Sequence, residues 1–211
     1  MSDLREDISV FYKGRKGSVD FVDVPSLLFA VVRGQGDPEG PDFAAALHAL
    51  FTVSYAAHFG LKKQTGEITK VMPLEALWWF DAPGQPQGMQ GVAAGFSGLS
   101  GIDRESWQWQ AMMVQPAPID EGVLERATEQ SRAKGLPSLD LLRFERWEEG
   151  RCAQTLHVGP YADEGPTIAL LDSVITAAGL QVRGKHHEIY LGDPRRSAPE
   201  KLRTLIRHPV V

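Results

Sequence analysis

Two stretches far apart in the chain, LEALWWFD at 74–81 and HEIYLGDP at 187–194, decide the fold, because each of them ends a similar unit. The first follows LLFAVVRGQGDPEG at 27–40 and an apolar segment with helical periodicity. The second follows CAQTLHVGPYADEGP at 152–166 and another such segment. Each unit therefore reads as a strand, a loop, a helix and then two strands, and the sequence predicts an internal repeat.

Apolar periodicity predicts three helices, at 41–59, 120–134 and 166–178. Pro41 suits the first turn of a helix, and Gly60 suits the end of the same helix. Runs rich in β-branched and aromatic residues predict the strands. One of these runs, LLRFERWEEGRCAQTLHVG at 141–159, predicts a hairpin that turns at Glu149 and Gly150.

These elements predict an α+β fold, a tandem strand-helix-strand-strand repeat whose antiparallel sheet carries the helices on one face and a ligand groove on the other. Residues 1–211 would form a single domain of two pseudo-symmetric repeats, at about 18–118 and 139–211, joined by a helical segment, 119–138. The stretch 81–106 is rich in Gly, Pro and Gln, and we expect it to form a long loop of the kind that often acts as a lid.

The composition is typical of a globular protein: the 211 residues are 43% hydrophobic and 23% charged. A net charge of −5, without any Lys/Arg run longer than two residues, argues against direct nucleic-acid binding. No apolar run approaches the ~20 residues of a membrane span, and no secretory signal is recognisable, so we expect a cytoplasmic protein. The single cysteine, Cys152, excludes an intrachain disulfide and a Cys-based zinc site.

Alternation along 186–191 places His186, Glu188 and Tyr190 on one face of a strand, and His187 and Ile189 on the other. The second set is mostly apolar and suits a core covered by helices, so we expect the Glu188 face to line the groove. The adjacent histidines point apart, and His186 with Glu188 lacks a third ligand in the sequence. We therefore expect neither a metal ion nor another cofactor.

The same alternation in the first unit places Glu75 and Trp79 on one face and Trp78 on the other. By the repeat, Trp79 is the candidate for the groove and Trp78 the candidate for the core. Trp107 and Trp109 share a face of the next strand, and alternation does not decide whether that face is groove or core. We expect Trp79, Trp107 and Trp109 to form a flat platform on which a planar ligand stacks.

Several stretches, LEALWWF, WQWQAMMVQP, LHVGPYADEGPTI and HHEIYLGDPRRSAPEKLRTLIRHPV, together resemble stand-alone GyrI-like proteins with the small-molecule-binding fold. The resemblance covers roughly 18–211 and is most specific between 188 and 210. It implies a ligand cleft between the two halves, in which a buried glutamate at the position of Glu188 is the central carboxylate. The family includes drug-binding domains of transcription regulators, a gyrase-inhibitory protein, and hydrolases that open the strained cyclopropane of DNA-alkylating natural products.

The chain departs from the regulators of this family because the repeats leave no room for a helix-turn-helix, which argues against a direct transcription-factor role. Its segment 81–106 and its polar second helix resemble the longer branch of the family, which contains the hydrolases.

From the residues alone, Glu188 has three possible roles: counter-charge for a cationic ligand, general base for a water molecule, or solvated strand residue. A carboxylate between aromatic walls is desolvated, which suits proton transfer near neutral pH. At the mouth of the third helix, Tyr161 could donate a hydrogen bond to a carbonyl oxygen that becomes negative as a cyclopropane opens. Three further side chains are candidates for ligand contact: Tyr190, Glu75 and Tyr55.

Two main hypotheses follow for the function. The first is an enzyme of detoxification that binds a bulky planar, hydrophobic molecule and hydrolyses its electrophilic cyclopropane, with Glu188 activating water and Tyr161 polarising the ligand. The second is a multidrug-binding or sensing module without turnover, in which Glu188 is the counter-charge. A gyrase-inhibitor-like interaction protein is a third and less supported hypothesis. The first two share one pocket, so the sequence does not separate them, and it leaves the oligomeric state open.

Overall fold

A computed structural model describes residues 8–80 and 103–211 of the chain. Within these residues the elements follow the predicted order, strand-helix-strand-strand, twice, with a further helix between the two units. The first unit comprises β1 (Val19–Gln35), α1 (Pro41–Thr65), β2 (Leu74–Trp79) and β3 (Gln108–Val114). The connecting helix is α2 (Glu121–Ser131), and the second unit comprises β4 (Arg143–Val158), α3 (Gly165–Ala177), β5 (His186–Tyr190) and β6 (Arg203–Pro209). The predicted α+β repeat is confirmed.

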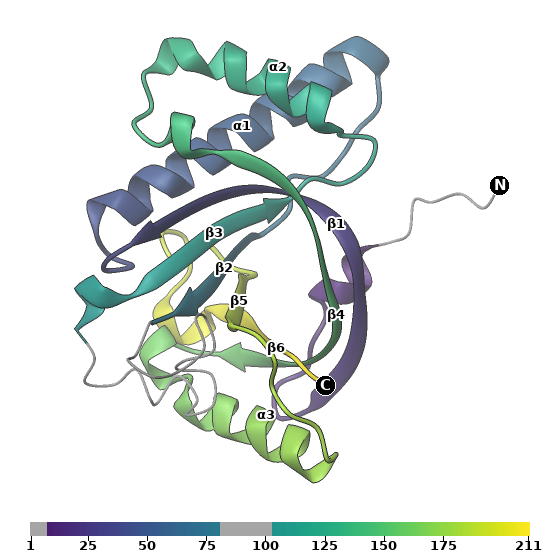
Figure 1. Cartoon of the computed structure of the whole chain (residues 1–211), viewed down its shortest axis with the longest axis vertical. Helices are drawn as coiled ribbons and strands as arrows, with labels where there is room; N and C mark the ends of the chain where they lie inside the picture. Colours follow the sequence, from purple (N-terminus) through teal and green to yellow (C-terminus); the bar gives the residue numbers. More distant parts are fainter. Residues whose placement is uncertain (1–7, 81–102) are drawn as a thin grey trace, which may run out of the picture.

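The six strands form one antiparallel sheet that closes into a barrel, in the order β1-β3-β2-β5-β6-β4. Each unit supplies three neighbouring strands, and the pairs β1–β4 and β2–β5 join the two units. Figure 1 shows α1 and α2 side by side on one side of the barrel and α3 on the opposite side. All three helices thus lie on the outer face of the sheet, and the other face is the barrel interior.

Helix α1 is longer than the segment predicted from its apolar stripe. It begins with Pro41 in its first turn, as predicted, but it continues through Gly60 to Thr65. The helix ends where Gly66 adopts a left-handed conformation, φ 77°, and donates its N–H to the carbonyl of Lys62. Gly60 is tolerated because buried Leu61, one residue later, continues the contact of the helix with the core. Of the described helices, α1 is the one with the length and apolar character of a membrane span, yet its buried stripe belongs to this core.

The predicted hairpin at Glu149 and Gly150 is wrong. Residues Arg143–Val158 form one continuous strand, β4, which pairs with β1 over nearly its whole length. Gly150 adopts φ 69°, a conformation that glycine takes without strain, and so allows β4 to bend around the barrel instead of turning back. The glycine signal was real, but it marks a bend within a strand.

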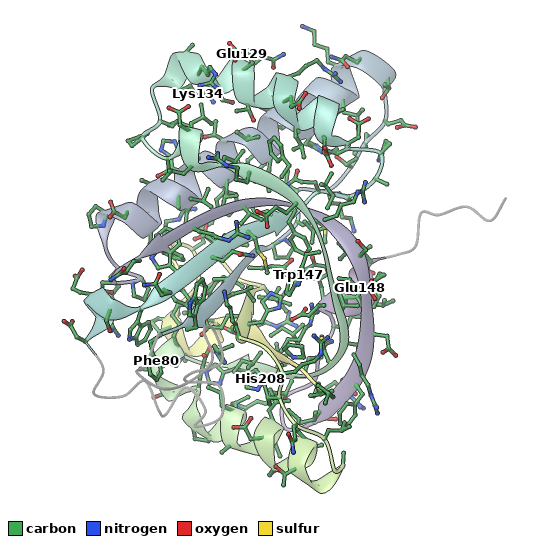
Figure 2. All side chains as sticks on the ribbon, in the orientation of Figure 1. Phe80, Glu129, Lys134, Trp147, Glu148 and His208 are labelled. Atoms are coloured by element: carbon green, nitrogen blue, oxygen red, sulfur yellow. The ribbon has the colours of Figure 1, made fainter. Side chains whose placement is uncertain are left out.

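The outer and inner faces of the barrel have different apolar clusters. Below α1, the outer cluster includes Phe43, Trp78 and Trp109. The interior cluster includes Phe29, Met112 and Trp147, and Figure 2 shows Trp147 directed from β4 into the barrel. The predicted alternation of side chains between the two faces of β5 is therefore confirmed. The assignment of the two faces was wrong, because the face that we expected to be covered by helices is the one inside the barrel. The Glu188 face lies outside, with the helices, whereas the His187 face lies in the filled interior.

A network of buried charged groups occupies the barrel interior beside the apolar cluster. The His187 ring lies between Glu75, at 3.0 Å from Nε2, and Glu149, at 2.9 Å from Nδ1. The other oxygen of Glu149 lies 3.1 Å from Arg207 Nη1, and Tyr12 donates its hydroxyl proton to Glu75 at 2.6 Å. The network ties four strands, β2, β4, β5 and β6, to the short helix η1 (Ile8–Tyr12), since Arg207 also donates to the carbonyl of Phe11 in this helix.

The pKa values of this network predict a dependence of stability on pH. Burial alone would raise the pKa of Glu149, but the charges of His187 and Arg207 outweigh it and lower the pKa to about 2. Burial alone would lower the pKa of His187, but Glu149 and Glu75 raise it to about 9. The contribution of His187 to the free energy of unfolding is present below pH 6.5 and is lost as the pH rises through 9. The contribution of Glu149 is present above pH 4.5 and is lost as the pH falls through 2.

We therefore expect the free energy of unfolding to be greatest between about pH 4.5 and 6.5 and to fall by up to about 3 kcal/mol between pH 6.5 and 10. Urea unfolding at several pH values measures this loss. In His187→Gln the loss should be much smaller, and an equal loss in both proteins would contradict the assignment to His187.

Gly34, near the end of β1, makes room for a tryptophan. A Cβ atom added there would overlap the Trp109 ring on the neighbouring strand β3. We expect Gly34→Ala to lower the free energy of unfolding by about 1–3 kcal/mol, because a packed core absorbs such an overlap only by shifting. Gly60→Ala in α1 is the control: nothing lies within 4 Å of its added Cβ, and this change should stabilise the helix slightly. Chemical denaturation of both variants measures the difference.

Candidate functional site

Glu188 lies buried on the outer face of β5, with 4% of its surface exposed. Tyr190 donates its hydroxyl proton to Glu188 Oε2 at 2.6 Å, and it accepts the indole N–H of Trp78 at 3.1 Å. The other carboxylate oxygen, Oε1, lies 3.1 Å from His186 Nε2. A carboxylate is thus held in place by a phenol and an imidazole, beside a tryptophan of the core under α1. The carboxylate is therefore largely shielded from solvent in this structure.

A second carboxylate, that of Glu164, faces the same place from the start of α3. Glu164 is 1% exposed, and neither of its oxygens has a partner at hydrogen-bond geometry among the described residues, although Glu188 and the Thr204 hydroxyl lie nearby. Burial first, and the nearby charge of Glu188 second, raise the pKa of Glu164 well above its ordinary value. Two carboxylates therefore share one buried site, and Glu164 is the one driven toward the protonated form.

Two histidines lie in a row between Glu188 and helix α3. His186 Nδ1 lies 3.0 Å from His208 Nε2 on β6, and His208 Nδ1 lies 3.4 Å from Asp172 Oδ1 on α3. Figure 2 labels His208, which is fully buried, whereas the Asp172 side chain is 34% exposed. Burial, with a contribution from His186, lowers the pKa of His208 and favours its neutral form.

Tyr161, the predicted hydrogen-bond donor to a ligand oxygen, lies at the edge of this site. It begins the short helix η6 (Tyr161–Asp163) before α3, and its ring meets that of Tyr190 edge-on at 5.7 Å. Burial, and the nearby Glu188, raise the pKa of Tyr161 to about 12, so that its phenol stays protonated and able to donate. The preceding loop is held by His157, whose Nε2 lies 3.0 Å from the carbonyl oxygen of Pro160.

The two tryptophans predicted for β3 lie on the outer face, on the side of Glu188. Trp107 is 6% exposed and meets Trp78 edge-on at 6.0 Å, which brings it toward the site through Trp78. Trp109 is 2% exposed and packs edge-on against Phe43 of α1 at 5.1 Å, as a core residue does. The structure therefore does not bring these rings together with Trp79 into the flat platform that we expected, because α1 covers this part of the face.

Three further predicted side chains are not brought to Glu188. Glu75 lies in the interior, where it binds Tyr12 and His187. Trp79 belongs to the interior cluster, and its ring lies 3.2 Å from Lys185 Nζ. Tyr55 is 48% exposed on α1, in a stacked row with Phe51 and Phe59.

The error at Glu75 and Trp79 has a single physical cause. Across the pair β2–β5, Glu188 lies opposite Ala76, and Glu75 lies opposite Ile189. Residues opposite each other share a face, so a shift of one residue in the alignment of the repeats moves a side chain to the other face. The counterparts of the Glu188 face on β2 are therefore Ala76 and Trp78.

Glu164, His186 and Glu188 form a group whose ligand atoms all lie within 4.8 Å of one another, and such a group could hold a metal ion. Sequence reasoning rejected a metal site because no third ligand was visible. The structure supplies a third candidate, Glu164, which immediately precedes α3 and approaches Glu188 on β5. The DEGP sequence at 163–166 indicates that Glu164 lies at the start of a helix. Nothing in that sequence indicates that Glu164 lies close to Glu188.

In chemical terms, the site combines a carboxylate that can accept a proton, a carboxyl group driven to retain one, and two phenols that can donate hydrogen bonds. Such a set suits proton transfer to and from a bound molecule. It also suits the binding of a cation, because neither carboxylate has a Lys or Arg salt-bridge partner among the described residues.

Comparison with known proteins agrees with the fold. Residues 18–211 match the family described as the GyrI-like small molecule binding domain. An uncharacterized conserved protein from Listeria innocua is 31% identical with a TM-score of 0.81, and the match covers 99% of each chain. A protein described as a hydrolase from the same organism is 30% identical with a TM-score of 0.78, again over 99% of each chain. No curated protein matches the sequence.

Proposed function

The chain belongs to the GyrI-like small-molecule-binding family, and we propose that it binds a bulky planar molecule at Glu188 and hydrolyses an electrophilic cyclopropane in that molecule. The observation that carries the proposal is the buried carboxylate of Glu188, held by Tyr190 and His186 beside a second carboxylate. Similarity to a Listeria innocua hydrolase over 99% of both chains supports a hydrolytic reaction. Detoxification in the cytoplasm is the role that such a reaction would have.

Glu188 acts as the general base in the proposed reaction. It removes a proton from water while the water oxygen bonds to a cyclopropane carbon and the strained carbon–carbon bond breaks. The electron pair of that bond moves to a conjugated carbonyl oxygen of the ligand. Tyr161 donates a hydrogen bond to this oxygen as it becomes negative, and its raised pKa of about 12 keeps the donor protonated.

A second function, binding without turnover, is favoured by a different observation. Two buried carboxylates without a Lys or Arg salt-bridge partner among the described residues suit a cationic, amphipathic molecule. In this case Glu188 is a counter-charge, and the protein sequesters or senses the molecule. The chemical identity of the bound ligand at the end of an incubation separates the two functions.

Incubation with a duocarmycin-type cyclopropane compound, followed by mass spectrometry, tests the enzymatic proposal. Addition of one water by the protein, faster than in buffer alone, supports hydrolysis. Tight binding with an unchanged ligand mass supports the binding function instead. If the compound neither binds nor changes in mass, both functions are contradicted for this class of ligand.

A further inference from the structure

The group of Glu164, His186 and Glu188 has the make-up of a metal site. Its three ligand atoms, one from each side chain, all lie within 4.8 Å of one another, and the residues are 1%, 2% and 4% exposed. They come from the turn before α3 and from strand β5. Transition metals such as zinc accept imidazole and carboxylate ligands together, whereas magnesium and calcium prefer oxygen ligands alone.

The contact between His186 and Glu188 already has nearly the spacing of two ligands of one ion. Nε2 of His186 lies 3.1 Å from Oε1 of Glu188. Zinc binds imidazole nitrogen and carboxylate oxygen at about 2.0–2.2 Å, so two of its tetrahedral ligand atoms lie about 3.3–3.5 Å apart. An ion can therefore bind both atoms, in place of the hydrogen bond between them, after a small displacement.

Glu164 is the member of the group that the surrounding protein leaves without a role. It is 1% exposed, and neither of its oxygens has a partner at hydrogen-bond geometry among the described residues. Its neighbour Asp163 is exposed, so the turn itself does not force the chain inward at this point. Burying an unpaired carboxylate is costly, and buried charges in proteins are normally paired or coordinate metals. Because its oxygens give up no hydrogen bond of this kind, Glu164 can move toward an ion at little cost.

A second buried polar group on the same face also lacks a partner. Thr204 of β6 lies opposite Tyr190 of β5, which places its side chain on the Glu188 face, and its hydroxyl lies near Glu164. This hydroxyl is fully buried and, within the part of the chain that the structure describes, has no partner at hydrogen-bond geometry. Zinc sites with three protein ligands keep a fourth position for water, and such a water molecule would give Thr204 a partner.

Neighbouring side chains hold two of the ligands in the orientation that an ion requires. Tyr190 donates its hydroxyl proton to Oε2 of Glu188 at 2.6 Å, which leaves Oε1 for the ion. Nδ1 of His186 lies 3.0 Å from Nε2 of His208. Histidines that bind a metal usually donate the N–H of their other ring nitrogen in this way, which fixes the ring and directs the ligating nitrogen to the metal.

We propose that Glu164, His186 and Glu188 bind one divalent transition-metal ion such as zinc, through one oxygen of each carboxylate and Nε2 of the imidazole. The two carboxylates have no Lys or Arg salt-bridge partner among the described residues, and a divalent ion balances their charge. The binding of the ion does not depend on the proposed hydrolysis, although both use Glu188.

Calorimetric titration of zinc into the untagged, chelator-treated protein tests the site. We expect one zinc ion per chain. Glu164→Gln should weaken its binding by about 100-fold or more, because residues that only support metal ligands are already worth about 10–100-fold. A melting curve of the metal-free variant shows that it is folded. Asp163→Asn, at the exposed neighbour, is the matched control and should bind zinc as the wild type does.

A wild type that takes up no zinc would overturn the proposal, as would equal zinc affinity in the wild type and Glu164→Gln. X-ray absorption of the zinc-loaded wild type is a check that needs no variant. We expect a shell of nitrogen and oxygen atoms at about 2.0–2.2 Å, with one imidazole and no sulfur. Two or more imidazoles would show that other histidines hold the ion, and the proposed site would be wrong.

Zinc binding and the proposed hydrolysis can fail separately. Oε1 of Glu188 cannot bind an ion and take a proton from water at the same time, so we expect saturating zinc to stop cyclopropane hydrolysis and a chelator to restore it. Hydrolysis that continues with the site filled would contradict the role of Glu188 as the base, but not the metal site. One bound zinc ion in a protein that does not hydrolyse the compound at all would contradict the proposed function alone.

Discussion

Replacing Glu188 by glutamine is expected to lower the rate of cyclopropane hydrolysis by about 10²–10⁴-fold, which is the usual contribution of a general base. Glutamine keeps the size of the side chain and can still accept a hydrogen bond from Tyr190, but it cannot remove a proton from water. Ligand affinity should change much less for a neutral planar compound. The measurement is turnover by mass spectrometry, together with a melting curve to show that the variant is folded.

Glu200→Gln is the matched control for this experiment, since Glu200 is an exposed glutamate in the short helix η7 (Pro199–Lys201). It should retain full activity. If Glu188→Gln and the control hydrolyse the compound equally fast, Glu188 is not the base. If Glu188→Gln instead weakens the binding of a cationic compound while no turnover occurs in either protein, the binding function is the correct one.

Replacing Arg207 by alanine is expected to lower the free energy of unfolding by about 3–5 kcal/mol, the usual effect of breaking a buried ion pair. Arg207 is 3% exposed and neutralises Glu149 at 3.1 Å, and its Nε donates to Gln154 at 2.9 Å. Without it, His187 is the remaining charged partner of the Glu149 side chain among the described residues, and the contact with the carbonyl of Phe11 in η1 is lost. Because whole domains are stable by only about 5–15 kcal/mol, this is a large fraction of the total.

Urea unfolding of Arg207→Ala and Arg203→Ala provides the test. Both arginines belong to β6, but Arg203 is exposed, and its replacement should change the stability by less than about 0.5 kcal/mol. Glu149→Gln offers a second way to break the same pair with a smaller change of shape. Equal losses for the two arginine variants would show that the interior ion pair does not contribute as proposed.

Much of the fold could be predicted from local patterns, because helices and strands have distinct apolar periods and the repeat shows their order. The closure of the sheet could not, because it depends on the pairs β1–β4 and β2–β5 between distant segments. The bend at Gly150 was read as a turn for the same reason: a glycine permits either outcome, and tertiary pairing decides which one occurs.

The part of the candidate site that lies on one strand could be predicted from the sequence. Alternation placed His186, Glu188 and Tyr190 together, and the structure confirms this arrangement through the contacts among them. Which face pointed outward was not predictable, because the interior holds charged groups such as His187 that no apolar pattern indicates. Glu164 was missed because its approach to Glu188 depends on how α3 packs on β4 and β6.

The shared closure of the barrel has a consequence for synthesis on the ribosome. When only the first unit has emerged, β1 and β2 each have one edge whose partner, β4 or β5, does not yet exist. Open strand edges pair readily with other chains, so the half-made protein is the form most exposed to aggregation. Only when residues of β5 and β6 leave the ribosome are the last edges covered. A fragment that ends after β3 should therefore be recovered mainly in aggregates, or bound to chaperones, and not as a small folded domain.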